Sequence, residues 1–145
     1  MMSDDNLYNF FPGLVGSPHK PISDATDDYN CFAFAAGINT ERWEPSLPWY
    51  WPRGAPRRPT REALVAAFRT LHYEPCDGAD LEEGFEKVAL YASGNLLTHA
   101  ARQLPSGTWI SKLGSGKDIE HKLEAIEGEH YGQVFQIMRR RAPIK

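Results

Sequence analysis

Apolar and polar residues follow two different periods along this chain, and the period changes near Lys87. Between residues 60 and 73 the apolar positions recur at helical spacing: Leu64, Val65, Phe68 and Leu71. From Lys87 onward apolar and polar residues alternate, which is typical of strands with two different faces. This alternation predicts strands at residues 87–92, 97–104, 108–113 and 131–139.

The segment from Cys31 to Ile38 is almost wholly apolar and predicts a short helix. The polar residues 27–30 precede it and provide side chains that cap helix N-termini, while Gly37 and Asn39 are stop signals. A helix without a polar face is a buried helix, so we expect it in the middle of the fold.

A second, amphipathic helix is predicted to begin after the capping residue Thr60 and to end near His72. A short edge strand is the expectation for residues 73–76. Residues 114–130 contain glycines and many charges, and they predict a loop with about one helical turn.

The order of these elements predicts an α+β fold. In it, the buried helix and the amphipathic helix pack on an antiparallel sheet of about four to five strands. Residues 1–26 are rich in Pro, Gly, Ser and Asp, and are expected to form an irregular N-terminal segment. Residues 27–141 would form a single domain, and residues 142–145 a C-terminal tail.

The segment 40–59 contains five prolines and three tryptophans. Dense proline excludes a regular helix or a central strand, but the aromatic residues argue against disorder. We therefore expect an ordered loop. It either covers the core or walls a cleft, in which case Trp43, Trp49 and Trp51 are candidate substrate-binding residues.

Composition and charge exclude several classes of protein. The net charge is -3, so no global basic field favours nucleic acid, and the basic run 139–141 is expected to be solvated. Two cysteines are too few for a disulfide framework. The sequence shows no signal peptide and no membrane span, which predicts a cytoplasmic protein without membrane contact; export without a cleaved signal stays an alternative. No cofactor motif is present.

Cys31 and His99 are the residues from which chemistry can be argued. Cys31 begins the predicted helix, and His99 lies in the middle of a predicted strand among small residues. A helix N-terminus and a neighbouring imidazolium lower the pKa of a thiol, and the imidazole then carries the proton to the leaving group. The acidic residues Asp27 and Asp28 would oppose formation of the thiolate.

The stretches "YNCFAFAAG" and "THAARQLPSGTWISKLGSGKDIEH" and the final "YGQVFQIMRR" resemble the papain-like cysteine peptidase superfamily, which includes bacterial cell-wall amidases and transglutaminase-like domains. They also resemble a family of small bacterial proteins, over about residues 29–139. The resemblance implies a papain-like core, Cys31 as nucleophile and His99 as base, acting on a peptide or another amide-containing substrate.

Other site residues follow from the same resemblance. Ser111 and Lys112 occupy the strand on which the superfamily carries the third catalytic residue. Asp118 and Gln103 are therefore the candidates for orienting His99. Asn30 is the candidate for a side chain that binds the oxyanion.

Three classes of function stay open at this stage. The first is a cysteine hydrolase or acyltransferase. The second is an inactive domain that binds a protein partner through loop 40–59, with Cys31 as a small core residue. The third is a metal-binding protein that uses His121 and His130 with the adjacent Glu120 and Glu129, although no metal-ligand spacing is present.

Overall fold

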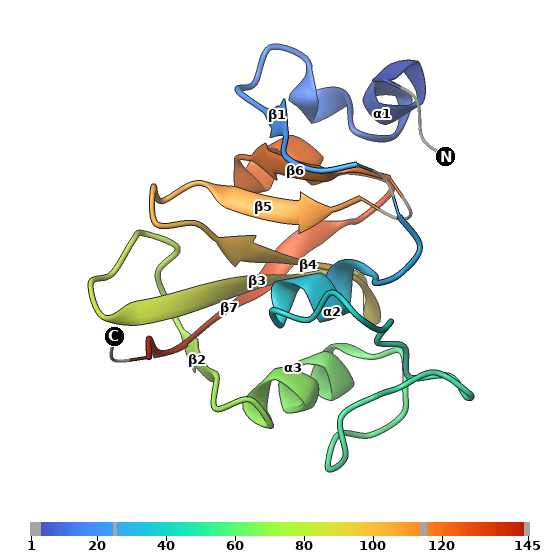
Figure 1. Cartoon of the computed structure of the whole chain (residues 1–145), viewed down its shortest axis with the longest axis vertical. Coiled ribbons are helices and arrows are strands. Elements are labelled where there is room, and N and C mark those ends of the chain that lie inside the picture. The colour runs from blue at the N-terminus through green and yellow to red at the C-terminus, as the bar shows by residue number, and fades with distance from the viewer. Residues whose placement is uncertain (1–3, 25, 114–115, 144–145) are drawn as a thin grey trace.

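A computed structural model describes residues 4–24, 26–113 and 116–143, with side chains from Leu7 onward. The main feature is a seven-stranded sheet in which every pairing is antiparallel, in the order β1-β6-β5-β4-β3-β7-β2 (Figure 1). The strands are β1 (Lys20–Pro21), β2 (Glu74–Cys76), β3 (Phe85–Ser93), β4 (Leu96–Gln103), β5 (Trp109–Lys112), β6 (Asp118–His121) and β7 (Gln133–Arg141). The helices are α1 (Asp4–Phe10), α2 (Cys31–Ala35) and α3 (Arg61–Arg69), with 3-10 turns η1 (Pro12–Leu14) and η2 (Leu123–Ile126).

Strands β3 to β6 form a meander, and β7 returns to pair with β3 along its whole length. Strand β2 then pairs with β7 and ends the sheet. The long pairing of β7 with β3 is the central contact of the fold, and its register shifts between Leu90 and Tyr91. A second register shift occurs where β3 pairs with β4, between Tyr91 and Ala92.

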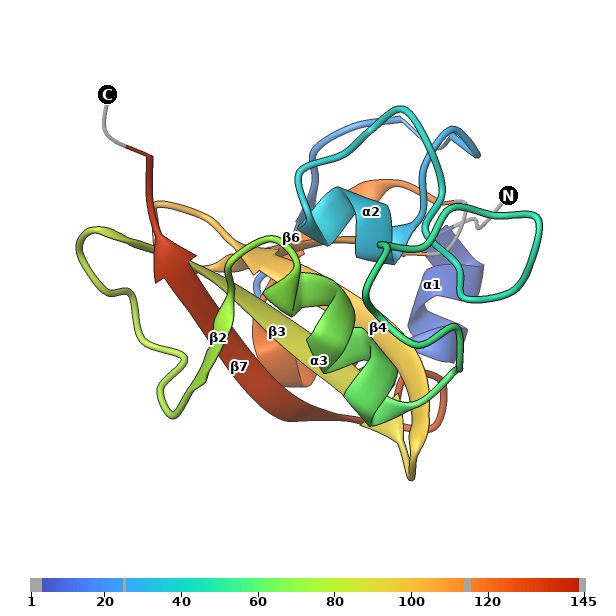
Figure 2. The ribbon, with the colours of Figure 1, turned by 90° about the horizontal axis from the view of Figure 1, so that it is seen from below.

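Both faces of the sheet are covered. Helices α2 and α3 and the loop 40–59 lie on one face. Figure 2 shows α3 in front of β3 and β4, and α2 contacts β4 and β5. The N-terminal segment and η2 pack on the other face, near the β1–β6 end of the sheet (Figure 1). The molecule therefore has three layers and two separate cores.

The first core lies between the sheet and the two helices. Helix α3 places Leu64 and Phe68 toward it, as its helical spacing predicts. The Thr60 side chain caps this helix by accepting a hydrogen bond from the N–H of Ala63. The sheet contributes Val88, Leu90, Ala100 and Met138, and the loop 40–59 contributes Trp43 and Trp51.

The second core lies on the opposite face, and alternation along the strands places different residues there. On β3, Ala89 and Tyr91 belong to this core, whereas Val88 and Leu90 belong to the first. The N-terminal segment covers this face with Leu7, Phe11 and Leu14, all buried. The segment expected to be irregular thus contains α1, η1 and β1, because its apolar residues have a sheet face to cover.

The predicted fold class is wrong. The structure is mostly a seven-stranded antiparallel sheet with few helices, not a papain-like core with four to five strands. Strand β6 was expected to be a loop, and β1 was not expected. The predicted strands correspond to β3, β4, β5 and β7, the two predicted helices correspond to α2 and α3, and β2 is the predicted edge strand. The predicted tail 142–145 is described only as far as Pro143.

Candidate functional site

Cys31 is the first residue of α2, as predicted. The residue is partly buried, and its thiol lies beside the backbone of Ala100 on β4. Desolvation by burial raises the pKa of the Cys31 thiol to about 12, and contacts with the backbone of Ala100 and Phe32 offset this effect only in part. The thiol is therefore protonated at neutral pH, which is unlike an activated nucleophile.

His99 lies on the other face of the sheet from Cys31. Its ring is fully buried against Tyr131, with ring centroids 4.1 Å apart, and meets the ring of Tyr91 edge-on at 5.3 Å. Both tyrosines belong to the second core, whereas Ala100, the next residue along β4, belongs to the first. The structure does not bring the predicted Cys31–His99 pair together.

A β-bulge in β4 places Leu97 and His99 on opposite faces of the sheet. Leu97 and His99 are two residues apart, so strict alternation along a strand would place them on one face. The register of β3 and β4 shifts between the pairs Tyr91–His99 and Ala92–Leu97, so Thr98 is an extra residue. Leu97 consequently packs on the first core, whereas His99 packs against Tyr131 of the second core.

The environment of His99 disfavours its charged form. No described residue forms a hydrogen bond with either ring nitrogen of His99. Desolvation, with smaller effects from His121 and His130, lowers the pKa of His99 well below 6.5.

His121 is also buried. Its Nε2 lies 2.6 Å from the Ser111 hydroxyl, and its Nδ1 lies 2.8 Å from the Lys122 carbonyl.

Asp118 lies on β6, on the same face as Cys31, and it does not orient His99. Its Oδ2 accepts hydrogen bonds from the hydroxyls of Ser23 and Tyr29. Its Oδ1 is buried without a hydrogen-bond partner among the described residues. Asp118 thus ties the N-terminal segment to the sheet edge.

Lys112 is a buried charged residue that the sequence interpretation did not assign. It pairs across the strands with Asp118, is fully buried, and donates a 2.7 Å hydrogen bond to the Gly116 carbonyl. Its ammonium lies 5.0 Å from the centre of the Tyr29 ring. Burial lowers the pKa of Lys112, while the charges of Asp118 and Asp27 oppose this effect. The sequence signal that was missed is a lysine at the end of the short predicted strand 108–113, directly before Leu113.

Two other candidate site residues make hydrogen bonds that hold the backbone. Asn30 caps α2: its Oδ1 accepts from the N–H groups of Ala33 and Trp43, and its Nδ2 donates to the Trp43 carbonyl. Gln103 donates from Nε2 to the carbonyls of Ala79 and Gly107. Neither side chain is placed to bind an oxyanion or to orient His99.

The three tryptophans of loop 40–59 have different environments. Trp43 and Trp51 are each 3% exposed and belong to the first core. Trp49 is 42% exposed, with the guanidinium of Arg42 5.2 Å from its ring centre. The loop mainly covers the core, and Trp49 alone of the three can meet a ligand at the surface.

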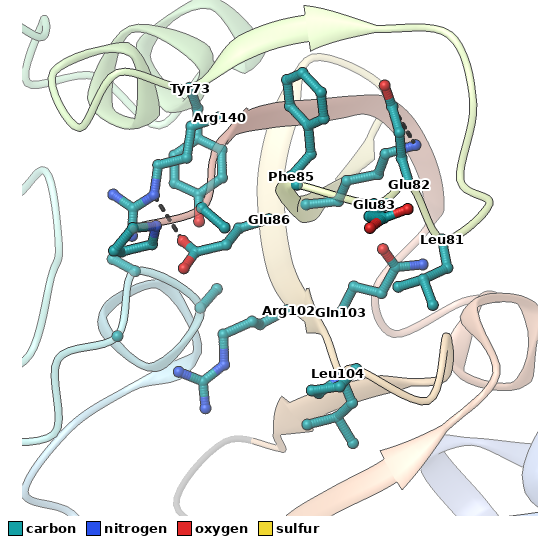
Figure 3. A pocket seen from close by; sticks show the side chains of 18 residues that line it. Tyr73, Leu81, Glu82, Glu83, Phe85, Glu86, Arg102, Gln103, Leu104 and Arg140 are labelled. Atoms are coloured by element: carbon teal, nitrogen blue, oxygen red, sulfur yellow. Dashed lines mark hydrogen bonds and ion pairs between the residues drawn. The ribbon is translucent and has the colours of Figure 1, made fainter. Parts of the chain in front are cut away.

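A pocket of about 710 Å³ lies between the C-terminal end of α2, the start of β3 and the end of β4. Figure 3 shows side chains from these elements and from the loop 77–84 directed around one hollow. The apolar part of its wall includes Leu81, Phe85, Leu104 and Pro105, together with Ala35 and Ala36 at the end of α2. Sequence patterns did not indicate this pocket because its lining comes from five separate segments.

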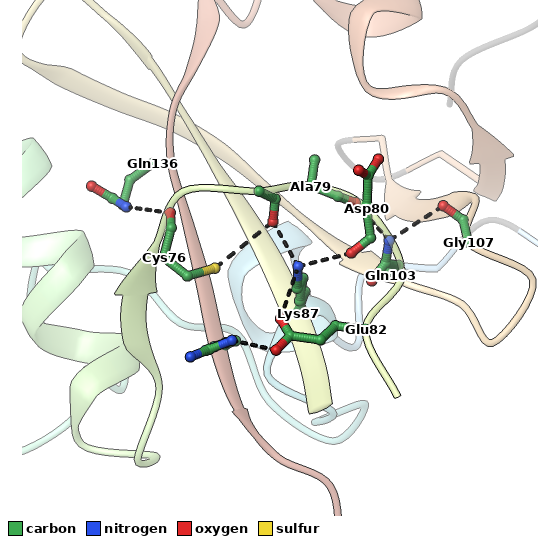
Figure 4. Close-up of polar contacts among 10 residues, drawn as sticks. Cys76, Ala79, Asp80, Glu82, Lys87, Gln103, Gly107 and Gln136 are labelled. Atoms are coloured by element: carbon green, nitrogen blue, oxygen red, sulfur yellow. Dashed lines mark hydrogen bonds and ion pairs between the residues drawn. The ribbon is translucent and has the colours of Figure 1, made fainter. Parts of the chain in front are cut away.

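The loop 77–84, which forms one wall, is held by two side chains from the sheet (Figure 4). Lys87 is buried and donates hydrogen bonds to the carbonyls of Gly78 and Asp80, at 2.7 and 2.8 Å. Gln103 donates a 2.9 Å hydrogen bond to the Ala79 carbonyl. Residues 78–80 are thereby fixed to β3 and β4, directly before the residues of the loop that line the pocket.

Metal binding has no support in the described part of the chain, where no group of three or more His, Cys, Asp or Glu side chains is placed to hold an ion. His121 and His130 do not form a metal site together, because His121 is buried whereas His130 is exposed, with its ring packed against Phe10 and Tyr131.

No helix in the described residues has the length and apolar character needed to cross a membrane.

The comparisons with known proteins give one family. Residues 20–139 match the model described as "Domain of unknown function (DUF7689)", and the chain belongs to this family. No curated protein and no solved structure matches the chain. These findings do not bear on the resemblance to cysteine peptidases, which stays a prediction. The family match begins after α1 and η1, although both contribute buried residues to the second core.

Proposed function

We propose that this chain is a domain that binds short peptides or similar amide compounds, and that the pocket between α2, β3 and β4 is its binding site. The pocket itself carries the proposal. Its volume of about 710 Å³ is within the range of small-ligand sites, and it combines apolar walls with a few charged side chains.

The anchoring of the loop 77–84 supports the proposal. A binding wall that is already ordered does not lose conformational entropy when the ligand arrives. Lys87 and Gln103 use partly buried hydrogen bonds to hold this loop, although it contains no regular secondary structure. The loop therefore loses its conformational entropy when the chain folds, and not when the ligand binds.

The hydrolase hypothesis has weaker support. It rests on the position of Cys31 at the start of α2, beside the N–H groups of a helix terminus. Against it, the thiol pKa of about 12 and the burial of His99 on the other face leave Cys31 without an activating base. A binding domain requires neither residue to react.

The experiment is a titration of ¹⁵N-labelled chain with a set of short peptides, some with free and some with capped termini. We expect resonance shifts at Gly37, Glu83 and Gln103, which line the pocket. Leu104→Trp should fill the pocket and abolish the shifts. The matched control Leu47→Trp, at a position 78% exposed and outside the pocket, should leave them unchanged.

Cys31→Ala should bind the peptides as well as the unmodified chain does, because the thiol does not line the pocket. Shifts confined to Trp49 and its neighbours would favour a partner site on loop 40–59 instead. The absence of shifts at the pocket with every peptide would show that the proposal is wrong.

A further inference from the structure

The charges that line the pocket are balanced, and most of them are paired. Three are acidic and three are basic: Glu82, Glu83, Glu86, Lys87, Arg102 and Arg140. Glu82 pairs with Lys87 at 3.4 Å and with Arg139, and Glu86 pairs with Arg140 at 2.8 Å. In the part of the chain that the structure describes, Arg102 and Glu83 have no ion pair.

Arg102 is held in a defined position. It lies on β4 and is partly buried, and its guanidinium is 4.8 Å from the centre of the Phe34 ring. Stacking on an aromatic face fixes the plane of a guanidinium while its N–H groups stay available at the edge. A carboxylate is the group that this edge binds best, through two parallel hydrogen bonds.

Glu83 lies on the loop 77–84, on a different segment of the same lining. Its side chain is exposed, and Figure 3 shows it at the hollow together with Arg102. The pocket therefore offers one unpaired positive group and one unpaired negative group, with Leu81 and Leu104 contributing apolar surface. A ligand with one charge of each sign and apolar side chains matches this arrangement.

We propose that the ligand of this pocket is a short zwitterionic peptide with free amino and carboxyl termini. Arg102 binds its carboxylate, Glu83 binds its ammonium group, and its apolar side chains pack on Leu81 and Leu104. The inference rests on the proposed function and specifies its ligand. A dianion such as inorganic phosphate fits less well, because three carboxylates also line the pocket.

The test compares three forms of one peptide: Leu-Leu with free termini, N-acetyl-Leu-Leu and Leu-Leu amide, each titrated by NMR, with Phe-Phe and Ala-Ala series alongside. We expect the amide to bind about tenfold more weakly than Leu-Leu, because it cannot form the charge-assisted pair with Arg102. The acetylated peptide should lose less affinity than the amide does, because Glu83 is exposed and solvent screens its ion pair with the ammonium group.

Two variants show which residue causes each loss of affinity. In Arg102→Gln the free acid and the amide should bind equally, and in Glu83→Gln the free and acetylated peptides should bind equally. Arg53→Gln is the matched control, since Arg53 is exposed and outside the pocket, and it should behave as the unmodified chain.

Equal binding of all three forms at the pocket would overturn the zwitterion inference and leave the proposed function standing. The zwitterion inference also fails, and the proposed function stands, if the pocket resonances shift only with capped or anionic peptides of the set used to test the proposed function. If no member of either set shifts them, the proposed function and the inference both fail.

Discussion

The imidazole of His99 lies flat against the ring of Tyr131, with ring centroids 4.1 Å apart and an angle of 10° between the planes. Neither ring nitrogen has a hydrogen-bond partner among the described residues, and the side chain is fully buried. A buried imidazole without a hydrogen bond is costly to retain and still more costly to protonate. This relationship makes the second core sensitive to acid.

We expect the free energy of unfolding to decrease as the pH is lowered from about 7 to about 5. Burial lowers the pKa of His121 to about 4 and that of His99 well below 6.5, so the unfolded chain binds protons that the folded chain does not. Their contribution is fully present above the unfolded pKa and is lost as the pH falls toward the folded pKa. The loss is roughly 2 kcal/mol per histidine over this range, measurable by urea denaturation.

The variant His99→Phe separates this effect from the titration of carboxylates. It keeps a flat ring against Tyr131 and removes one titrating group, so the loss of stability between the two pH values should be smaller by roughly 2 kcal/mol. An unchanged pH dependence in this variant would show that His99 has the same pKa in the folded and unfolded chains, which would contradict the effect of burial.

Alkylation of Cys31 by iodoacetamide should be slow at neutral pH. With a thiol pKa of about 12, its thiolate fraction is about a thousandfold smaller than that of a free cysteine. The measurement uses Cys76→Ser, so that Cys31 is the one thiol present, and follows the labelled mass over time.

The hydrolase hypothesis makes the opposite prediction for the same measurement. It requires fast alkylation of Cys31 and a large decrease in rate in His99→Ala. If the thiol reacts faster than free cysteine and the rate depends on His99, the chain must reach a state in which the two residues meet.

The sequence predicted the elements better than it predicted the faces of the sheet. Alternation identified β3, β4, β5 and β7, and helical spacing together with Thr60 identified α3. Both faces are covered, however, so the usual rule of apolar-in and polar-out does not say which face meets α2. The bulge at Thr98 leaves no clear sequence signal, and it reverses the face on which His99 lies relative to Leu97.

Strand β6 and the pocket were missed for different reasons. Strand β6 has four residues, of which Asp118 and His121 are polar and yet buried, so its composition is typical of a loop. The pocket depends on the position of the loop 77–84, which Lys87 and Gln103 fix through backbone carbonyls. Contacts to carbonyl groups are independent of the sequence of the loop, and local patterns therefore cannot reveal them.

Replacing Lys87 by Met should destabilise the chain and loosen the pocket wall. The ammonium of Lys87 is buried and serves the carbonyls of Gly78 and Asp80, which would lose these partners. We expect a loss of about 1–3 kcal/mol and faster hydrogen exchange in the loop 77–84. Lys122→Met, at an exposed position, is the control and should change neither. Unchanged exchange in the loop of Lys87→Met would contradict the anchoring role.

Replacing Asn30 by Ala should cost more than the loss of an ordinary helix cap. Its Oδ1 accepts from two N–H groups, those of Ala33 and Trp43, and its Nδ2 donates to the Trp43 carbonyl. The side chain is 8% exposed, so water cannot readily replace these bonds. We expect a loss of roughly 2–4 kcal/mol in chemical denaturation.

The matched comparison for Asn30→Ala is Thr60→Ala, which removes one hydrogen bond, to the N–H of Ala63, from a partly buried cap of α3. The free energy of unfolding of Thr60→Ala should be about 1 kcal/mol lower than that of the unmodified chain. The larger loss at Asn30 would identify it as the residue that fixes loop 40–59 to the start of α2. If the two variants lose the same amount, the bonds to Trp43 contribute nothing to stability, and Asn30 is a helix cap only.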